Sequence, residues 1–183
     1  MDNIQTSLTI IEITVETIQD VNKTDTTHEI KSRIVPYIEN GIFYYTVEEI
    51  FPAYVKTYEE DDIDYSIYIN NPDKVVFLAY VDGIPAGQIV LRRNWNSIAY
   101  IEDIRVGCNF RRKGTGIKLI NKAEEWARNG GMQGIMLETQ DVNVPACKLY
   151  EKTGYILGGV DKKLYGAIEK YSHETALFWY KIF

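Results

Sequence analysis

Cysteine, histidine and long hydrophobic runs are scarce in this sequence, and each scarcity excludes a class of protein. Two cysteines, Cys108 and Cys147, are too few for a disulfide framework, and no spacing of cysteine and histidine fits a metal site. No apolar stretch reaches the length of a membrane span, and the polar first residues are unlike a signal peptide. We therefore expect a cytoplasmic protein without a metal and without a membrane partner.

Positive charge is also in short supply. The chain has 26 acidic and 20 basic residues, which gives a net charge of −6, and this balance argues against a nucleic-acid partner. It suits instead a small cationic ligand that is drawn to an acidic surface. With 183 residues, 45% of them hydrophobic and 25% charged, the chain is long enough for one globular domain with a real core.

Apolar patterning predicts strands and helices that alternate along most of the chain. Asp82-Gly83, between two apolar runs, favours a tight hairpin turn. Residues 17–23 could open a helix, and residues 26–70 show no clear pattern. The expected fold is α/β or α+β, with a mixed central sheet built around a three-stranded meander and flanked by helices. Strands are expected at residues 8–15, 74–81, 86–93, 99–106, 134–139, 155–160 and 175–182, and helices at 117–129 and 145–153.

The segment Arg111–Gly116, with the sequence RRKGTG, is the most informative motif. It connects a predicted strand to a predicted helix, and its two glycines let backbone N–H groups approach a ligand closely. The start of a helix adds unpaired amides and a partial positive charge that suit an anion such as phosphate. The spacing excludes a Walker A loop and the dinucleotide-binding fingerprint. A basic turn between a strand and a helix, with no ligand, is the alternative interpretation.

A second motif follows one strand later. The apolar run Ile135–Leu137 predicts a buried strand, Asn143 closes it, and Pro145 suits the first turn of the next helix. Tyr150 lies seven residues after Asn143, and Gly154 follows that helix. Taken singly, Tyr150 would be a core residue and Gly154 a helix C-cap.

Together the two motifs, in this order and at this distance, resemble those of the GNAT family of N-acetyltransferases. The pattern R-x-x-G-x-G, with Arg111, Gly114 and Gly116 as its fixed positions, is similar to the family's pyrophosphate-binding motif. The resemblance implies that the chain uses acetyl-CoA as co-substrate and needs no metal. It also implies one N-acetyltransferase domain over residues 1–183, with a cofactor-binding core at about residues 75–160.

The resemblance also assigns the cofactor-binding residues. Backbone amides at Ile104, Arg105 and Val106 are expected to bind the pantetheine arm or to polarise the thioester carbonyl, and a β-bulge could free them for this. Asn143 is expected to hydrogen-bond the pantetheine. The pyrophosphate is expected to be held by Arg111, Arg112, Lys113, Gly114, Thr115 and Gly116.

Acetyl transfer to a primary amine needs a group that accepts a proton, because such an amine has a pKa of about 10. The resemblance places this base on one of two neighbouring strands, with Glu102 as our first choice and Glu138 as the second. Strand alternation would put Glu102 on one face and Asp103 on the other. A carboxylate that is only solvated, or is paired with Arg105, is the alternative. By the same resemblance, Tyr150 is the general acid that protonates the departing thiolate.

Acidic and aromatic residues suggest how the acceptor binds. Asp61 and Asp62, in the acidic run at residues 59–64, are candidates for binding a small cationic amine. Asp103 and Trp95 are further candidates for the same role. The alternatives are a solvated loop for the acidic run and a packing residue at a turn for Trp95.

At finer grain, five segments resemble one branch of the family, the streptothricin acetyltransferases. The branch implies acetylation of an amine on the β-lysine moiety of streptothricin, and hence resistance to that antibiotic. Other small amines (polyamines, aminoglycosides or lysine), a peptide acceptor and non-catalytic acyl-CoA binding remain as alternatives, and a homodimer is possible. The five segments are residues 54–62, 91–96, 99–104, 137–141 and 178–180.

Overall fold

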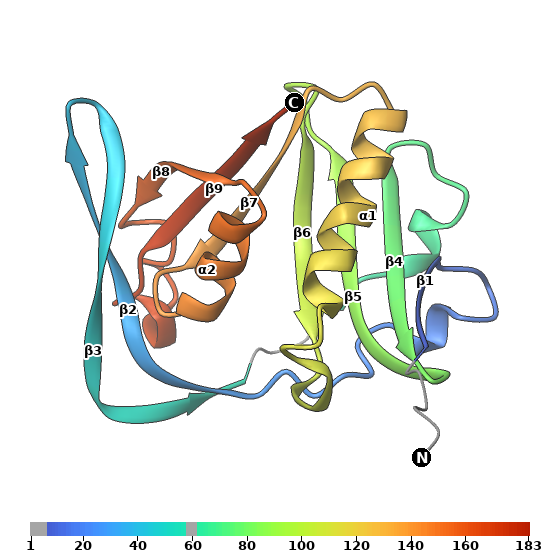
Figure 1. Cartoon of the computed structure of the whole chain (residues 1–183), viewed down its shortest axis with the longest axis horizontal. Helices are drawn as coiled ribbons and strands as arrows, with labels where there is room; N and C mark the ends of the chain where they lie inside the picture. The colour runs from blue at the N-terminus through green and yellow to red at the C-terminus, as the bar shows by residue number, and fades with distance from the viewer. Residues whose placement is uncertain (1–6, 58–61) are drawn as a thin grey trace, which may run out of the picture.

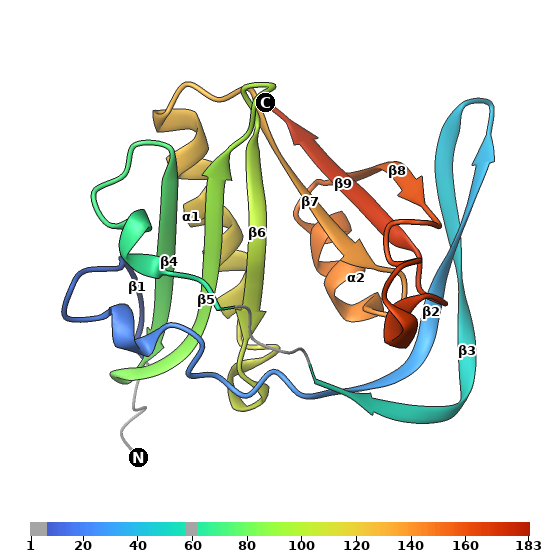
Figure 2. The same cartoon turned by 180° about the vertical axis from the view of Figure 1, so that it is seen from behind.

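The computed structural model describes residues 7–57 and 62–183, which form a seven-stranded sheet and a separate two-stranded ribbon (Figures 1 and 2). Strands β1 (Leu8–Glu12), β4 (Lys74–Val81), β5 (Ile84–Arg93), β6 (Ala99–Val106), β7 (Gly134–Gln140), β9 (Ala176–Ile182) and β8 (Ile156–Asp161) follow one another in this spatial order across the sheet. The ribbon pairs β2 (His28–Glu39) with β3 (Ile42–Lys56). Helices α1 (Thr115–Asn129) and α2 (Val144–Lys152) lie on one face of the sheet. The predicted mixed sheet with helices is confirmed.

The central meander forms as predicted. Strands β4, β5 and β6 pair antiparallel in sequence order. Asp82 and Gly83 join β4 to β5 with φ angles of 51° and 79°, as a tight hairpin turn with a left-handed backbone requires. Both bounds of β6 agree with the sequence prediction.

Strands β6 and β7 lie side by side only at their first residues. Their parallel pairing joins Ala99–Ile101 to Ile135–Leu137 and stops there. Beyond these residues the two strands diverge, so that the sheet opens between them (Figure 1). The divergence leaves the second half of β6 paired with β5 on one side only.

A β-bulge lies at the point where the strands diverge. Val90 of β5 pairs with Asp103, and the next residue of β5 pairs with Ile101, which leaves Glu102 as an extra residue in β6. A bulge kinks its strand and increases the local twist. The bulge therefore turns β6 away from β7.

Two apolar clusters cover the two faces of the sheet. On the helical face, Leu119, Ile120, Ala123 and Ala127 of α1 are fully buried, as their helical spacing predicts. This cluster continues through Tyr150 of α2 to the strands of the far half of the sheet. A smaller cluster on the opposite face gathers Ile13, Val21, Tyr68, Val76, Leu78 and Val90.

The ribbon is the main element that the sequence pattern did not predict. It stands beside the β8 end of the sheet and packs against α2 and β9 (Figure 1). The Ile34 amide donates a hydrogen bond to the Asp141 carbonyl at 2.8 Å, and the Tyr45 ring meets the Trp179 ring edge-on at 6.2 Å. These contacts attach the ribbon to the half of the sheet that contains β7, β8 and β9.

Residues 17–23 do not open a helix. Only one 3-10 turn forms there, at Ile18–Asp20, because Val21 is extended and buried and Asn22 takes a left-handed φ of 63°. Among the described residues, no helix is both long enough and apolar enough to span a membrane.

Candidate active site

The loop between β6 and α1 has the backbone geometry of an anion site. Gly114 is the residue before the first turn of α1 and has a left-handed φ of 86°, and Arg112 has a φ of 61°. The first amides of the helix have no carbonyl partner one turn earlier, and they carry the positive end of the helix dipole. The predicted phosphate loop therefore opens a helix, as the sequence indicated.

Two side chains of this loop are used to shape it. The Arg111 guanidinium donates hydrogen bonds to the carbonyls of Val106, Thr27 and Thr26, at 3.1, 3.1 and 2.8 Å. The buried Thr115 hydroxyl donates to the Phe110 carbonyl at 3.3 Å. Arg111 thus fastens the loop to the segment before β2, and the exposed side chains of Arg112 and Lys113 are the cations that can reach an anion.

The second half of β6 offers a free backbone edge next to the loop. Ile104, Arg105 and Val106 pair with Ile89, Gln88 and Gly87 of β5, but pairing with β7 has already ended. An extended chain can hydrogen-bond such an edge in the way that a further strand would. The bulge that the sequence could only suggest is present, and it lies directly before this edge.

Helix α2 brings the second motif against the start of α1. The Asn143 side chain caps α2 by accepting a hydrogen bond from the Ala146 amide at 3.4 Å. Gly116 allows a close approach where the helices meet, because a Cβ there would lie 3.0 Å from the Leu149 side chain. Tyr150 is 3% exposed, and its ring lies 6.1 Å from that of Tyr155. Tyr150 is therefore a core residue beside the loop, and its role as an acid stays a prediction.

The prediction that Glu102 and Asp103 occupy opposite faces is wrong. The extra residue in β6 breaks the alternation, so both carboxylates point to the face without helices. Glu102 accepts hydrogen bonds from the Tyr68 hydroxyl at 2.7 Å and from Arg92 Nε at 3.1 Å. Arg105, the partner that the alternative interpretation gave to this carboxylate, donates instead to Asp103 at 2.8 Å.

Asp103 also accepts a hydrogen bond from the buried Gln88 amide, at 2.7 Å. Its two partners hold it in the sheet beside Glu102. Tyr68, the partner of Glu102, has a raised pKa because it is desolvated and because it donates to a carboxylate. Tyr68 therefore remains a hydrogen-bond donor at any physiological pH.

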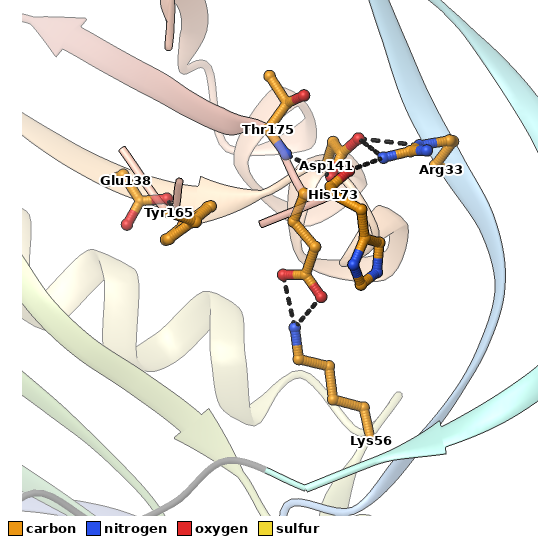
Figure 3. A network of polar contacts seen from close by, with 8 residues as sticks. Arg33, Lys56, Glu138, Asp141, Tyr165, His173 and Thr175 are labelled. Carbon is orange, nitrogen blue, oxygen red and sulfur yellow. Dashed lines mark hydrogen bonds and ion pairs between the residues drawn. The ribbon is translucent and has the colours of Figure 1, made fainter. Parts of the chain in front are cut away.

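Glu138 lies on the same face, on the other side of the opening. It follows Met136 by two residues on β7, and Met136 pairs with Tyr100 of β6. The Tyr165 hydroxyl donates a hydrogen bond to Glu138 Oε1, and Figure 3 shows the two side chains meeting. Burial raises the pKa of Glu138, and the hydrogen bond from Tyr165 opposes that rise.

Three buried charged residues lie near Glu138, and no sequence pattern indicated a role for any of them. Lys56, Asp141 and Glu174 are the charged residues among the fully buried side chains of the described ranges. Lys56 contacts Glu174, and Asp141 contacts Arg33 (Figure 3). Lys56 and Glu174 are 118 positions apart in the chain, so no local sequence pattern predicts their contact.

The proposed substrate-binding residues do not all gather here. Asp61 lies outside the described residues, and Asp62 is exposed. Trp95 is 91% exposed, in the turn between β5 and β6. That turn is at the start of β6, whereas the phosphate loop follows its end, so the structure separates Trp95 from the loop. Of the described members of this group, Asp103 joins Glu102 and Glu138 on one face.

Comparisons with known proteins agree with this geometry. Residues 43–155 match the model of the acetyltransferase (GNAT) family. The chain is 42% identical over 171 residues to streptothricin acetyltransferase A of Bacillus subtilis (strain 168), with 93% of this chain and 98% of that protein covered.

Two crystal structures are similar over almost the whole chain. One is a protein of Bacillus anthracis (strain Ames), assigned as a streptothricin acetyltransferase, in complex with acetyl coenzyme A; the TM-score is 0.90 at 40% identity, with 97% of this chain and 100% of that chain covered. The other is nourseothricin acetyltransferase, with a TM-score of 0.81 at 26% identity and coverages of 97% and 99%.

Proposed function

This chain belongs to the acetyltransferase (GNAT) family and is an N-acetyltransferase that uses acetyl-CoA, and we propose that its acceptor is an amine on the β-lysine moiety of streptothricin. The observation that carries this proposal is the 42% identity with streptothricin acetyltransferase A along 93% of the chain. Streptothricin is a cationic amine, and acetylation removes one of its positive charges. The proposed biological result is resistance to that antibiotic.

The face of the sheet without helices suits such an acceptor. Three carboxylates on the strands beside the β6–β7 opening lie on this face, those of Glu102, Asp103 and Glu138. Tyrosine rings stand beside them, and Tyr68 and Tyr165 donate hydrogen bonds to two of these carboxylates. Arg92 and Arg105 already pair with the first two of these carboxylates. Glu138 and the aromatic faces favour a cation, so this face is the proposed amine site.

The helical side and the free edge of β6 fit the cofactor. We assign the pyrophosphate to the amides at Gly114–Gly116 with Arg112 and Lys113, because these amides begin α1 and both cations are exposed. The unpaired edge at Ile104–Val106 is assigned to the pantetheine arm. When bound, acetyl-CoA supplies the acetyl group as an activated thioester.

The reaction also needs a proton acceptor, and Glu138 is the better of the two candidates. Both oxygens of Glu102 are occupied, one by Arg92 and the other by Tyr68. Glu138 uses only Oε1, and no group in residues 7–57 and 62–183 bonds to its Oε2. We propose that Oε2 takes the proton of the amine, directly or through water.

Tyr150 is proposed as the group that returns a proton to the departing sulfur. Its helix packs against the start of α1, on the side of the sheet where the cofactor is assigned. A phenol suits this task because phenols and thiols titrate in the same region, at about 8.5 to 10. Holding both reactants in one place would supply much of the remaining rate gain.

The test is a thiol-release assay with purified protein, acetyl-CoA and streptothricin, followed by mass measurement of the product. We expect stoichiometric thiol release and a product that carries one additional acetyl group, placed on the β-lysine moiety by fragmentation. Spermidine, an aminoglycoside, free lysine and a lysine peptide serve as competing acceptors. A higher kcat/KM for any of them than for streptothricin would contradict the proposed acceptor while leaving the family assignment intact.

A further inference from the structure

The buried charges of this protein are concentrated behind one loop. The loop comprises residues 162–175 and connects β8 to β9. Lys56, Asp141 and Glu174, the fully buried charged residues in the described part of the chain, all lie against it or within it. Burying charges is costly, and apolar side chains of similar volume would often give equal or greater stability. This concentration therefore calls for a reason other than stability.

The first ion pair fastens the end of the loop to the ribbon. Lys56 is the last residue of β3, and its Nζ contacts both carboxylate oxygens of Glu174, at 2.5 and 2.7 Å. The two side chains are only 4% and 1% exposed. The Lys56 ammonium also lies 4.5 Å from the centre of the Tyr171 ring. Two separate points of the loop are thus held by one lysine.

The second ion pair fastens the same end of the loop to β2 and to the residue that follows β7. Arg33 donates to Asp141 Oδ2 from Nε and Nη2, at 2.9 and 2.6 Å. Asp141 Oδ1 accepts the Thr175 amide at 3.0 Å, and Arg33 Nη2 also donates to the His173 carbonyl at 3.0 Å. Backbone groups of the loop are therefore bonded directly to this pair (Figure 3).

The other end of the loop is fixed by a turn that places Tyr165 beside Glu138. Asp161 Oδ1 accepts the amides of Lys163 and Leu164, at 2.6 and 3.1 Å, and the Gly166 amide closes the turn on the Lys163 carbonyl at 2.8 Å. Tyr165 is buried, and its hydroxyl donates to Glu138. With both ends fixed, the loop has little freedom to move this hydroxyl.

We propose that Tyr165 is a positioning residue for acetyl transfer: it holds Glu138 so that Oε2 faces the amine, and the two ion pairs keep the loop that carries Tyr165 in register. The proposal rests on the proposed function of Glu138 as proton acceptor. A directional hydrogen bond at Oε1 restricts rotation of the carboxylate and stabilises its charged form. Burying these charges would then lower the stability of the fold but fix the position of the Glu138 carboxylate for catalysis.

Other charged groups near Glu138 do not replace this contact. Glu174 and Lys56 reach it electrostatically with opposite signs, Glu174 raising and Lys56 lowering the pKa of Glu138. Across the opening, Tyr100 is itself held neutral, because burial and the charge of Glu138 raise its pKa. Tyr165 is the described residue that hydrogen-bonds to the carboxylate of Glu138.

The test is Tyr165→Phe, with Tyr171→Phe as the matched control in the same loop. We expect Tyr165→Phe to lower kcat by about 10- to 100-fold, with the KM for acetyl-CoA within about twofold of wild type. Loss of the hydrogen bond raises the pKa of Glu138, so the acid limb of the kcat/KM profile should move to higher pH. Tyr171→Phe keeps the ring beside Lys56 and should change neither kcat nor the profile.

A second pair of variants tests the ion pair. Lys56→Met alone leaves Glu174 buried without its counterion and should lower Tm. The double variant Lys56→Met/Glu174→Leu should recover Tm but keep kcat at least about fivefold below wild type, because the loop loses its register. A double variant with wild-type kcat would show that the pair has no positioning role.

A direct titration separates this proposal from the choice of acceptor. Carboxyl carbon NMR of protein labelled at glutamate, with Glu138→Gln used for assignment, reports the pKa of Glu138 without any substrate. An unchanged Glu138 pKa in Tyr165→Phe would overturn the proposal whichever amine the enzyme acetylates. If streptothricin fails as acceptor but the pKa rises in this variant, the positioning role stands and only the acceptor is wrong.

Discussion

The two faces of the sheet around the β6–β7 opening are built from different chemistry. The groups that fit the cofactor are mostly backbone amides, at the start of α1 on the helical face and along the free edge of β6. On the opposite face, the groups that fit the acceptor are side chains, above all Glu102, Glu138 and Tyr165. A backbone site needs only glycines and a helix start, so it leaves a short motif. A side-chain site gathers residues from distant segments and leaves none.

Tyr150→Phe tests the largest contribution expected from the helical face. If the phenol supplies a proton to the departing sulfur, kcat should fall by about 10²–10⁴-fold while the affinity for CoA changes little. Tyr155→Phe is the matched control: its ring lies 6.1 Å from that of Tyr150, and its buried hydroxyl has no partner among the described residues. Steady-state kinetics and CoA calorimetry on both variants measure the difference. Wild-type turnover by Tyr150→Phe would leave this tyrosine with a packing role only.

Glu138→Gln tests the opposite face. We expect kcat to fall by about 10²–10³-fold, against less than about tenfold for Glu102→Gln, because Glu102 already has both oxygens occupied. Since burial raises the pKa of Glu138, wild-type kcat/KM should decline as pH falls through a value above the usual glutamate range of about 4.3. The pH–rate profiles of all three proteins provide the measurement. A larger decrease in kcat for Glu102→Gln than for Glu138→Gln would identify Glu102, on β6, as the base.

Gly114→Glu should damage cofactor binding and leave the acceptor face intact. A side chain at a φ of 86° is strained, and a carboxylate there would repel the pyrophosphate, so the KM for acetyl-CoA should rise by about tenfold or more. Gly83→Glu is the control, because Gly83 has a φ of 79° and equally open space but lies in the β4–β5 turn. We expect the two variants to have similar decreases in Tm. Only Gly114→Glu should change the KM for acetyl-CoA. Equal KM values in the two variants would remove the loop from the cofactor site.

Asp62→Asn should have the smallest effect. If the acidic run attracts the cationic acceptor, the acceptor KM should rise by about twofold at low ionic strength and stay unchanged at high salt. Glu125→Gln removes an exposed carboxylate from α1, on the other face, and should have no effect at either salt concentration. A salt-independent KM in Asp62→Asn would mean that this carboxylate is simply solvated.

Most of the sheet could be predicted from the sequence because its strands have a local signature. Strands β4, β5 and β6 are apolar runs separated by compact turns, and α1 has a clear apolar stripe. The phosphate loop was found in the same way. The ribbon was not, because its two strands mix tyrosines, charges and exposed aliphatic residues such as Ile38 and Val55, so that neither face gives a clean alternation.

The acceptor face escaped prediction for two physical reasons. The alternation that assigned Glu102 and Asp103 to opposite faces assumes an unbroken pleat, and a bulge has no reliable signature in one sequence. The contacts of Glu138 with Tyr165 and of Lys56 with Glu174 join positions that are 27 and 118 residues apart. Only the folded backbone brings such residues together.

The extra residue in β6 has a further consequence for the design of this enzyme. Deleting Glu102 would leave Ile101 and Ile104 facing the core and would bring consecutive residues of β5 and β6 back into step. The shortened strand would lose its kink and pair with β7 along its full length. The new hydrogen bonds would close the opening between the two strands. A single inserted amino acid therefore keeps β6 and β7 from pairing along the opening where the two substrates must meet.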